Sequence, residues 1–360
     1  MIPTIADLIL TTVAFAGVLA VLIIAHELGH LITAKSSGVK VEEFGLGFPP
    51  RLFGVRWGET LYSLNAVPLG GFCKMAGEED PTAGPRTLAS KPIGTRLLVL
   101  SAGSLMNILL PLLLFSIAFM VPHNVVVGQV VVAEVAPNSP AARAGIEPGD
   151  TLLRINDKPV RNTGDIHRYI HLNLGKETTL LVKHSDSTTE NVRLIPRWKP
   201  PEGQAAVGIA IRTLNPTVIR QSEPFWRAIP LGVSECIETL GIFKNAIITM
   251  IIGVTPVAVA GPVGIAKMTG EAVRAGFSPL LGFAAFLSLN LAIINMFPIP
   301  ALDGGRIVFV LLEWVRRGKR VSPRIEGLIH MIGFAMLIGL ILIITYQDII
   351  RIITGESLIP

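Results

Sequence analysis

The chain has 360 residues, of which 50% are hydrophobic and only 16% are charged, and its net charge is +5. A soluble globular protein carries about 25% charged residues, and here the deficit is concentrated in long uncharged runs, which excludes an ordinary soluble domain and indicates an integral membrane protein. The positive excess is typical of cytoplasmic loops, and no nucleic-acid-binding motif is present, so we expect a lipid bilayer and no nucleic acid as partner. Cys73 and Cys236 lie far apart and predict no disulfide framework.

The first predicted element is the apolar run Leu8–Ala34, which is interrupted only near its end by "HELGH" and is long enough to cross a bilayer as a helix. The residues before it, "MIPTIAD", contain no basic stretch, and no small-x-small cleavage site follows the run. These features disfavour a cleaved signal peptide. We therefore expect residues 1–34 to remain as the first transmembrane helix.

A loop rich in lysine and arginine follows at 35–96. Within it, "TLYSLNAVPLGGFCKM" (60–75) is predicted to form a β-hairpin that turns at Pro68-Leu69-Gly70-Gly71. Taken by itself, this segment is consistent with an ordinary cytoplasmic hairpin. The next uncharged run, at 97–121, predicts the second transmembrane helix.

The segment 122–212 differs in character, because much of it is polar and resembles a folded soluble domain. Ser139 is a predicted helix N-cap with Pro140 at the first helical position, and Gly145 fits the position just past the helix end. A strand "TLLRIN", a helix at 165–174 and the strands "TTLLVKH" and "ENVRLIP" complete the prediction. We expect a compact α+β module.

The last third of the chain predicts a third span at 277–305, a basic loop at 306–327, and a fourth span with a C-terminal tail at 328–360. Both basic loops should be cytoplasmic by the positive-inside rule. The chain must then cross the membrane an odd number of times between them. The uncharged run 245–266, which is rich in glycine and proline, should therefore not span, and we expect 213–276 to be interfacial or re-entrant.

This topology places both termini and the module at 122–212 outside the cytoplasm. It also places Cys73 inside and Cys236 outside, so a membrane-impermeant thiol reagent should label Cys236 and spare Cys73.

The end of the first run, "IIAHELGHLITAK" (23–35), carries three ionisable side chains where lipid is expected. In a helix, His26 and His30 lie on one face, so both imidazoles can bind one metal ion with Glu27 beside them. This is the H-E-x-x-H pattern, in which the glutamate is the general base for a metal-bound water. A chance match, or histidines hydrogen-bonded inside a bundle, is disfavoured because each ionisable residue in a span costs roughly 2.5–3.5 kcal/mol.

A catalytic zinc keeps three protein ligands and one open position, so a third ligand is needed. The stretch "NMFPIPALDGG" (295–305) offers Asp303, followed by two glycines that permit a sharp turn. Asp303 could instead be a helix-end residue at the water boundary. The topology favours the ligand, because it places Asp303 and the two histidines near the cytoplasmic ends of their spans.

Three further histidines need an interpretation. His167 and His171 also stand four residues apart, but they lack an adjacent glutamate and a third ligand, so we expect a surface or groove-lining role. His330, in the fourth run, is expected to be solvated or hydrogen-bonded, with a catalytic role the less favoured alternative.

"HELGH" together with "NMFPIPALDGG" resembles the paired signature of the site-2 protease family of intramembrane zinc metalloproteases, and the resemblance covers nearly the whole chain. "NSPAARAGIEPGD" resembles part of a circularly permuted bacterial PDZ domain, of which we expect a single copy. "AVPLGGFCKMAGE" and "VAGPVGIAK" are also similar to family segments. The expected fold class is thus a membrane α-helical protein of four transmembrane helices, with a membrane-associated β-hairpin and an inserted extracytoplasmic PDZ domain.

The resemblance implies that Zn²⁺ is the cofactor, that His26, His30 and Asp303 are its ligands, and that Glu27 is the catalytic base. It implies that Asn295 holds the substrate backbone or the developing oxyanion, although an amide satisfied within the bundle is the alternative.

The resemblance further implies that the hairpin, with Gly70 and Gly71 at its turn, re-enters the membrane from the loop 35–96 and pairs with an extended substrate. The role of Asn107 is open, because Ser104 stands where relatives usually carry proline.

The predicted function is hydrolysis of peptide bonds in or near the transmembrane segment of single-span proteins in the plasma membrane. The resemblance implies an anti-sigma factor as substrate, cut after a first protease has acted, with remnant signal peptides as an alternative. A non-catalytic PDZ-bearing adaptor would lack a ligand or the base, and none is missing. A zinc transporter would need acidic or histidine residues along several spans, and only one cluster is present. The module could recruit clients or exclude those with large external domains, and the resemblance favours exclusion.

Overall fold

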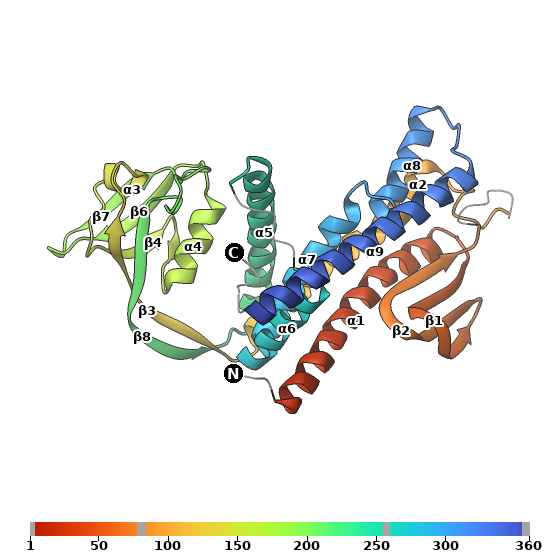
Figure 1. Cartoon of the computed structure of the whole chain (residues 1–360), viewed down its shortest axis with the longest axis horizontal. Helices are drawn as coiled ribbons and strands as arrows, with labels where there is room; N and C mark the ends of the chain where they lie inside the picture. The colour runs from red at the N-terminus through yellow and green to blue at the C-terminus, as the bar shows by residue number, and fades with distance from the viewer. Residues whose placement is uncertain (1–3, 78–83, 255–259, 355–360) are drawn as a thin grey trace. The chain divides into compact units, whose positions relative to one another are not determined.

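The structure is a computed structural model that describes residues 4–77, 84–254 and 260–354 (Figure 1). The chain divides into two compact units, one formed by residues 1–118 with 258–360 and the other by residues 119–257. The first unit contains helices and a small β-sheet, and the second contains a larger sheet with short helices and one long helix.

The helices of the first unit are α1 (Ile5–Ser36), α2 (Ile93–Met120), α6 (Pro262–Ala275), α7 (Phe277–Met296), α8 (Asp303–Val315) and α9 (Pro323–Thr354). Four of these, α1, α2, α7 and α9, are long and apolar enough to cross a membrane. Large apolar side chains are exposed along them, among them Ile9 and Leu342. Such a surface is stable in lipid and unfavourable in water, so this unit is the core of an integral membrane protein.

Helix α1 begins with a capping box, in which Thr4 and Asp7 each satisfy a backbone N–H of the other. Its last turns pack against α2, α8 and the small sheet through a buried cluster. This cluster consists of Leu31, Ala34, Val39, Val41, Cys73, Met75, Leu88, Val99, Leu100 and Val310. It fixes the end of α1 that carries the paired histidines.

The small sheet is formed by β1 (Val41–Trp57) and β2 (Thr60–Met75), and it corrects the predicted hairpin. The two halves of 60–75 do not pair with each other. Instead they flank the first half of β1, so that Phe44 is paired with Tyr62 on one side and with Cys73 on the other. The prediction failed because it looked for a partner within 60–75, whereas β1 supplies the partner for both halves. The second half of β1 also pairs with the first half of β2, from Arg51↔Asn65 to Trp57↔Thr60.

The third predicted span, 277–305, is also corrected. Helix α7 ends at Met296, and Phe297 is extended (φ −65°, ψ 145°) because it precedes a proline, which disfavours helical backbone there. A short loop follows, and Asp303 opens the separate helix α8. The predicted basic loop at 306–327 is therefore helical up to Val315.

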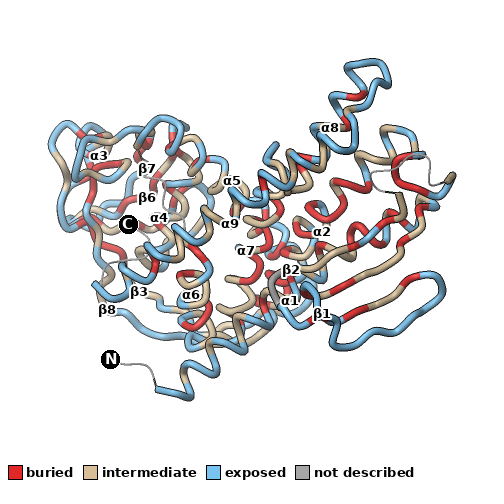
Figure 2. Tube along the Cα trace, turned by 45° about the vertical axis from the view of Figure 1, so that its right-hand side comes forward, coloured by how far each residue is buried: buried red, intermediate tan, exposed pale blue. Residues whose placement is uncertain are grey.

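The second unit holds β3 (His123–Val135), β4 (Thr151–Ile155), β5 (Lys158–Pro159), β6 (Thr178–Lys183), β7 (Thr189–Leu194) and β8 (Ile209–Gln221). The strands form an antiparallel sheet in the order β7-β6-β4-β3-β8, with β5 on β4. Its helices are α3 (Pro140–Arg143), α4 (Thr163–Leu172) and α5 (Phe225–Ile251). Figure 2 shows buried segments within this unit, where the core is built mainly from the strands and α4.

The sequence predictions for this module hold at the level of its elements. Ser139 caps α3 by accepting a hydrogen bond from Ala142 N–H, Pro140 stands first in the helix, and Gly145 has a left-handed φ of 80°. The predicted end of the module at residue 212 is too early, because β8 pairs with β3 as far as His123↔Gln221. The first and last strands form a long ribbon whose far end lies beyond that boundary.

Helix α5 is held against α4 by polar contacts. Arg168 pairs with Glu235 and, at 3.1 Å, with Glu238, while the side chain of Asn245 donates a hydrogen bond to His171 O at 2.6 Å. Part of the predicted interfacial run 245–266 is thus helical, up to Ile251, and its middle, 255–259, lies outside the described residues. Pro262 begins α6, the first helical position being one that proline favours.

Candidate metal and catalytic site

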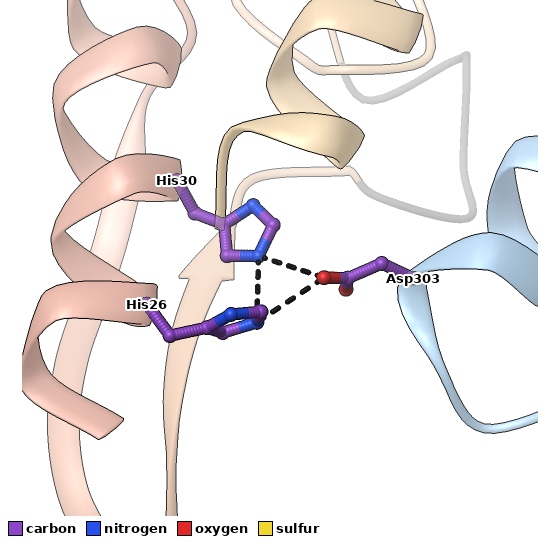
Figure 3. A group of neighbouring side chains, drawn as sticks. All are labelled: His26, His30 and Asp303. Atoms are coloured by element: carbon purple, nitrogen blue, oxygen red, sulfur yellow. Dashed lines mark hydrogen bonds and ion pairs between the residues drawn. The ribbon is translucent and has the colours of Figure 1, made fainter. Parts of the chain in front are cut away.

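The last turns of α1 present both histidines of "HELGH" on one face (Figure 3). The Nε2 atoms of His26 and His30 are 3.3 Å apart, and both residues are buried. The carboxylate of Asp303, at the first turn of α8, reaches them from another part of the chain. Its Oδ2 lies 3.1 Å from His26 Nε2 and 3.3 Å from His30 Nε2. The structure therefore brings together the three residues that the sequence nominated.

This triangle of atoms fits a zinc ion. Zinc bound tetrahedrally at about 2.0–2.1 Å places its ligand atoms about 3.3 Å from one another, close to the three separations found here. No conventional hydrogen bond satisfies the buried Oδ2 of Asp303 among the described residues. Within residues 4–77, 84–254 and 260–354, these three residues form the only His, Cys, Asp or Glu cluster whose ligand atoms all lie within 4.8 Å.

A glycine of α2 leaves room in front of the histidines. A Cβ atom at Gly103 would lie 2.3 Å from His30 Nε2 and 2.7 Å from His26 Nε2. Any side chain at this position would therefore occupy the space on which the nitrogen atoms converge. The sequence analysis missed Gly103, because a glycine within an apolar run carries no pattern that indicates a metal site.

The other ring nitrogens of the two histidines have polar neighbours. His30 Nδ1 lies 2.8 Å from the carbonyl oxygen of Val99, which fixes the proton on Nδ1 and leaves the Nε2 lone pair for a metal. His26 Nδ1 lies 3.3 Å from Nδ2 of Asn107 and 3.5 Å from Nδ2 of Asn295. When His26 binds a metal through Nε2, its Nδ1 carries the proton, and an amide accepts that proton only after a half-turn that brings its oxygen to this position.

Both asparagines are thus near the histidine cluster. Asn107 is fully buried, and its backbone oxygen accepts a hydrogen bond from Ser288 at 2.8 Å, which ties α2 to α7. Asn295 lies within reach of His26, and the substrate-binding role suggested by resemblance stays a prediction.

Glu27 and one strand of the small sheet line a cavity of about 300 Å³ in front of the three nominated ligands. The strand contributes residues 71–75, and Arg306 lines the same cavity. A Cβ at Gly71 would lie 2.9 Å from Glu27 Cγ, so the strand backbone touches the predicted base. Gly70 has a φ of 111° and faces Phe48 at the bend before the strand. Of the two nominated glycines, Gly71 lies at the cavity and Gly70 does not line it.

The remaining histidines lie elsewhere. His167 and His171 line a second cavity of about 320 Å³ in the other unit, and in the described residues no metal cluster includes them. Burial, and to a lesser extent the neighbouring His167, lowers the pKa of His171, which favours the neutral ring. The ring of His330 accepts a hydrogen bond from a backbone N–H next to the Asp303 loop, a contact that the sequence did not predict.

Comparison with known proteins identifies matching sequences along most of the chain. The model of peptidase family M50 matches residues 14–340. A candidate zinc metalloprotease of Clostridium acetobutylicum is 38% identical over 335 residues, covering 92% of this chain and 94% of the relative. The regulator of sigma-W protease RasP of Bacillus subtilis is 27% identical over 427 residues, covering 95% and 99%. Among solved structures, the PDZ domain of an SdrC-like protein from Listeria innocua is 22% identical with a TM-score of 0.21, covering 24% of this chain and 97% of that domain.

Proposed function

The chain belongs to peptidase family M50, the site-2 protease family, and is a zinc metalloendopeptidase; we propose that it hydrolyses peptide bonds in or near the transmembrane segment of single-span membrane proteins. The observation that carries this proposal is the convergence of His26, His30 and Asp303 at 3.1–3.3 Å beside Glu27. These side chains come from α1 and α8, and the cavity in front of them can accept an extended peptide.

In this proposal the two imidazoles and the Asp303 carboxylate hold the zinc ion. When bound, zinc supplies Lewis acidity toward a scissile carbonyl and an attacking water. Glu27 lines the same cavity and takes the proton from the attacking water, then delivers it to the leaving amine. The Val99 carbonyl keeps His30 in the tautomer that binds metal.

The strand at 71–75 is proposed to hold the substrate in extended form. A helical substrate has its peptide groups occupied by its own hydrogen bonds, so it must be unwound before it can be cut. Residues 71–75 pair with β1, and they line the catalytic cavity. Strand addition supplies backbone hydrogen bonds to an extended peptide. Gly71 allows this strand to pass against Glu27.

Two variants test the chemical roles. Glu27→Gln should abolish cleavage and leave the zinc content near that of wild type, because it removes the base and no ligand. Asp303→Ala should lower both zinc content and cleavage. Asp157→Ala, at an exposed position in the other unit, is the matched control and should change neither. Full zinc occupancy in Asp303→Ala would remove Asp303 from the ligand set.

The natural substrates are proposed to be membrane anti-sigma factors, by analogy with the relative named a regulator of sigma-W protease. Remnant signal peptides are the alternative class. The Glu27→Gln variant keeps the proposed binding residues and should retain uncut clients, so proteins that co-purify with it and not with wild type are the candidates. A single-span anti-sigma factor among them supports the first class, and only short signal-peptide remnants would support the second.

The module of the second unit is proposed to be a PDZ domain outside the cytoplasm, with α5 and α6 near the membrane interface. It has a cavity between α4 and the start of β8, where PDZ domains would add an extended peptide. We favour exclusion of clients with bulky external domains over recruitment of clients by their ends, because a folded module can block access without specific contacts.

The ribbon of β3 and β8 allows a clean deletion. Val127 pairs with Thr217, so removal of residues 129–214 leaves the paired base of the ribbon closed by a short loop. Under exclusion, the deleted enzyme should keep its zinc and cut clients whose external domain has not been trimmed. Under recruitment, it should cut even trimmed clients more slowly. Loss of cleavage of a trimmed client by a zinc-replete deletion would contradict exclusion.

A further inference from the structure

Helix α9 contacts the loop that precedes the proposed ligand Asp303, although little of α9 is buried. Of its 32 residues, all described, only Gly333 and Asp348 are classed as buried. A Cβ at Gly333 would lie 2.3 Å from Pro300 Cβ and 2.9 Å from Pro300 O. The surface of α9 therefore lies directly against the loop between α7 and α8. Figure 1 labels these three helices.

One hydrogen bond crosses this contact. The backbone N–H of Ala301 donates to Nδ1 of His330 at 2.9 Å. The ring of His330 also packs beside Phe309 of α8, with ring centroids 5.5 Å apart. His330 therefore links α9 both to the loop and to the helix that the loop precedes.

Ala301 has an unusual backbone. Its φ of 77° is in the left-handed region, which L-residues with a Cβ adopt at an energetic cost. Such a conformation persists where the surroundings hold it. The acceptor on His330 and the close packing of Gly333 on Pro300 are the contacts from α9 that hold it.

The backbone of Ala301 controls the direction of Asp303, two residues later. Between them, Leu302 is extended, and its N–H donates to Ile299 O at 3.2 Å. A Cβ at Gly304 would lie 2.1 Å from Phe297 O, so the first turn of α8 is packed directly on the loop. Because this short segment is held by contacts, a change in the backbone conformation of Ala301 would shift the position of the Asp303 carboxylate.

We propose that His330 is a positioning residue, whose Nδ1 holds Ala301 in its left-handed conformation and so aims the Asp303 carboxylate at His26 and His30. The inference rests on the proposed role of Asp303 as a zinc ligand. His330 does not reach the reacting atoms in this scheme and acts only through the loop.

Two substitutions separate the hydrogen bond from the bulk of the ring. His330→Leu keeps much of the apolar volume and removes the acceptor. His330→Asn places an amide oxygen close to the position of Nδ1 and keeps the acceptor. Phe309→Leu is the control for ring packing, because it removes the neighbour of His330 and leaves the hydrogen bond.

The measurement is zinc affinity of the purified full chain, by competition with a chromophoric chelator, together with kcat and KM at saturating zinc. His330→Leu should weaken zinc binding about tenfold, the lower end of what loss of an outer-shell partner costs, and should lower kcat with little change in KM. His330→Asn and Phe309→Leu should stay within about threefold of wild type. Unchanged affinity in His330→Leu, or an equal loss in His330→Asn, would overturn the proposal.

A second variant tests the backbone mechanism directly. Glycine adopts positive φ without the cost that alanine carries, so Ala301→Gly combined with His330→Leu should recover most of the lost zinc affinity. If the double variant does not recover zinc affinity, the proposal is overturned. It is also overturned if both His330→Leu and the double variant fail to fold, because His330 would then serve folding alone. Failure of this proposal can be told apart from failure of the proposed function. If Asp303 is not a zinc ligand, the Asp303→Ala variant will keep its zinc, whatever the His330 variants do.

Discussion

Replacing Gly103 with alanine places one methyl group where the two histidine rings converge. The added Cβ would lie 2.3 Å from His30 Nε2, whereas ordinary contact begins at 3.4 Å, so about 1 Å must be gained by moving a ring or a helix. Zinc sites tolerate deviations of only about 0.2 Å in ligand distance. We therefore expect Gly103→Ala to weaken zinc binding by at least about 100-fold, or about 2.7 kcal/mol, and to lose cleavage accordingly.

Gly94→Ala is the matched control on the same helix. Apart from its chain neighbours and the backbone of its own helix, no described atom lies within 4 Å of a Cβ at Gly94. Both substitutions raise helix propensity, by up to about 1 kcal/mol in a helix interior, so a general effect on α2 would be shared by the two variants. The assay is a chelator competition for zinc, with thermal unfolding of each variant to confirm that it is folded. A zinc affinity in Gly103→Ala within threefold of wild type would refute the steric reasoning.

Two other expectations concern orientation and pH. Cys73 and Cys236 are both buried, so the labelling predicted from sequence is better made with Ser185→Cys and Lys319→Cys in a chain without native cysteines. An impermeant thiol reagent should label the first and spare the second in intact cells, and the reverse pattern would contradict the predicted topology. Burial raises the pKa of Glu238, but its two cationic partners outweigh this and lower the pKa below its usual 4.5. The ion pairs of Glu238 with Lys158 and Arg168 thus contribute to the stability of the second unit above pH 4.5, and this contribution is lost as pH falls through the folded pKa of Glu238. A Glu238→Gln variant should show a flatter decline in melting temperature with acid, and an unchanged slope would contradict this reasoning.

Much of the fold and of the proposed site could be predicted from sequence, because these features depend on residues close together in the chain. The spacing of His26 and His30 places both on one face of any helix, and long uncharged runs identify the helices long enough to span. Ser139, Pro140 and Gly145 predicted α3 and its ends because capping depends on neighbours within a few residues.

The predicted hairpin failed because its pairing partner is distant in the chain, whereas the predicted third span failed for a local reason. The arms of 60–75 pair with β1 and not with each other, because β1 offers hydrogen bonds to both. The end of α7 at Met296 was readable in principle, since Phe297 precedes a proline, but the uncharged run continued past it and concealed the break.

By itself, the sequence determined which residues could bind a metal: two histidines and a glutamate on one helix, and an aspartate followed by two glycines far along the chain. It could not determine that the aspartate reaches the histidines, because that depends on how α8 packs against α1 and α2. The same packing places the Val99 carbonyl at His30, the bare backbone of Gly103 before both rings, and the His330 acceptor at Ala301. Backbone atoms and missing side chains carry no pattern in sequence, so only the tertiary structure decides what they contact.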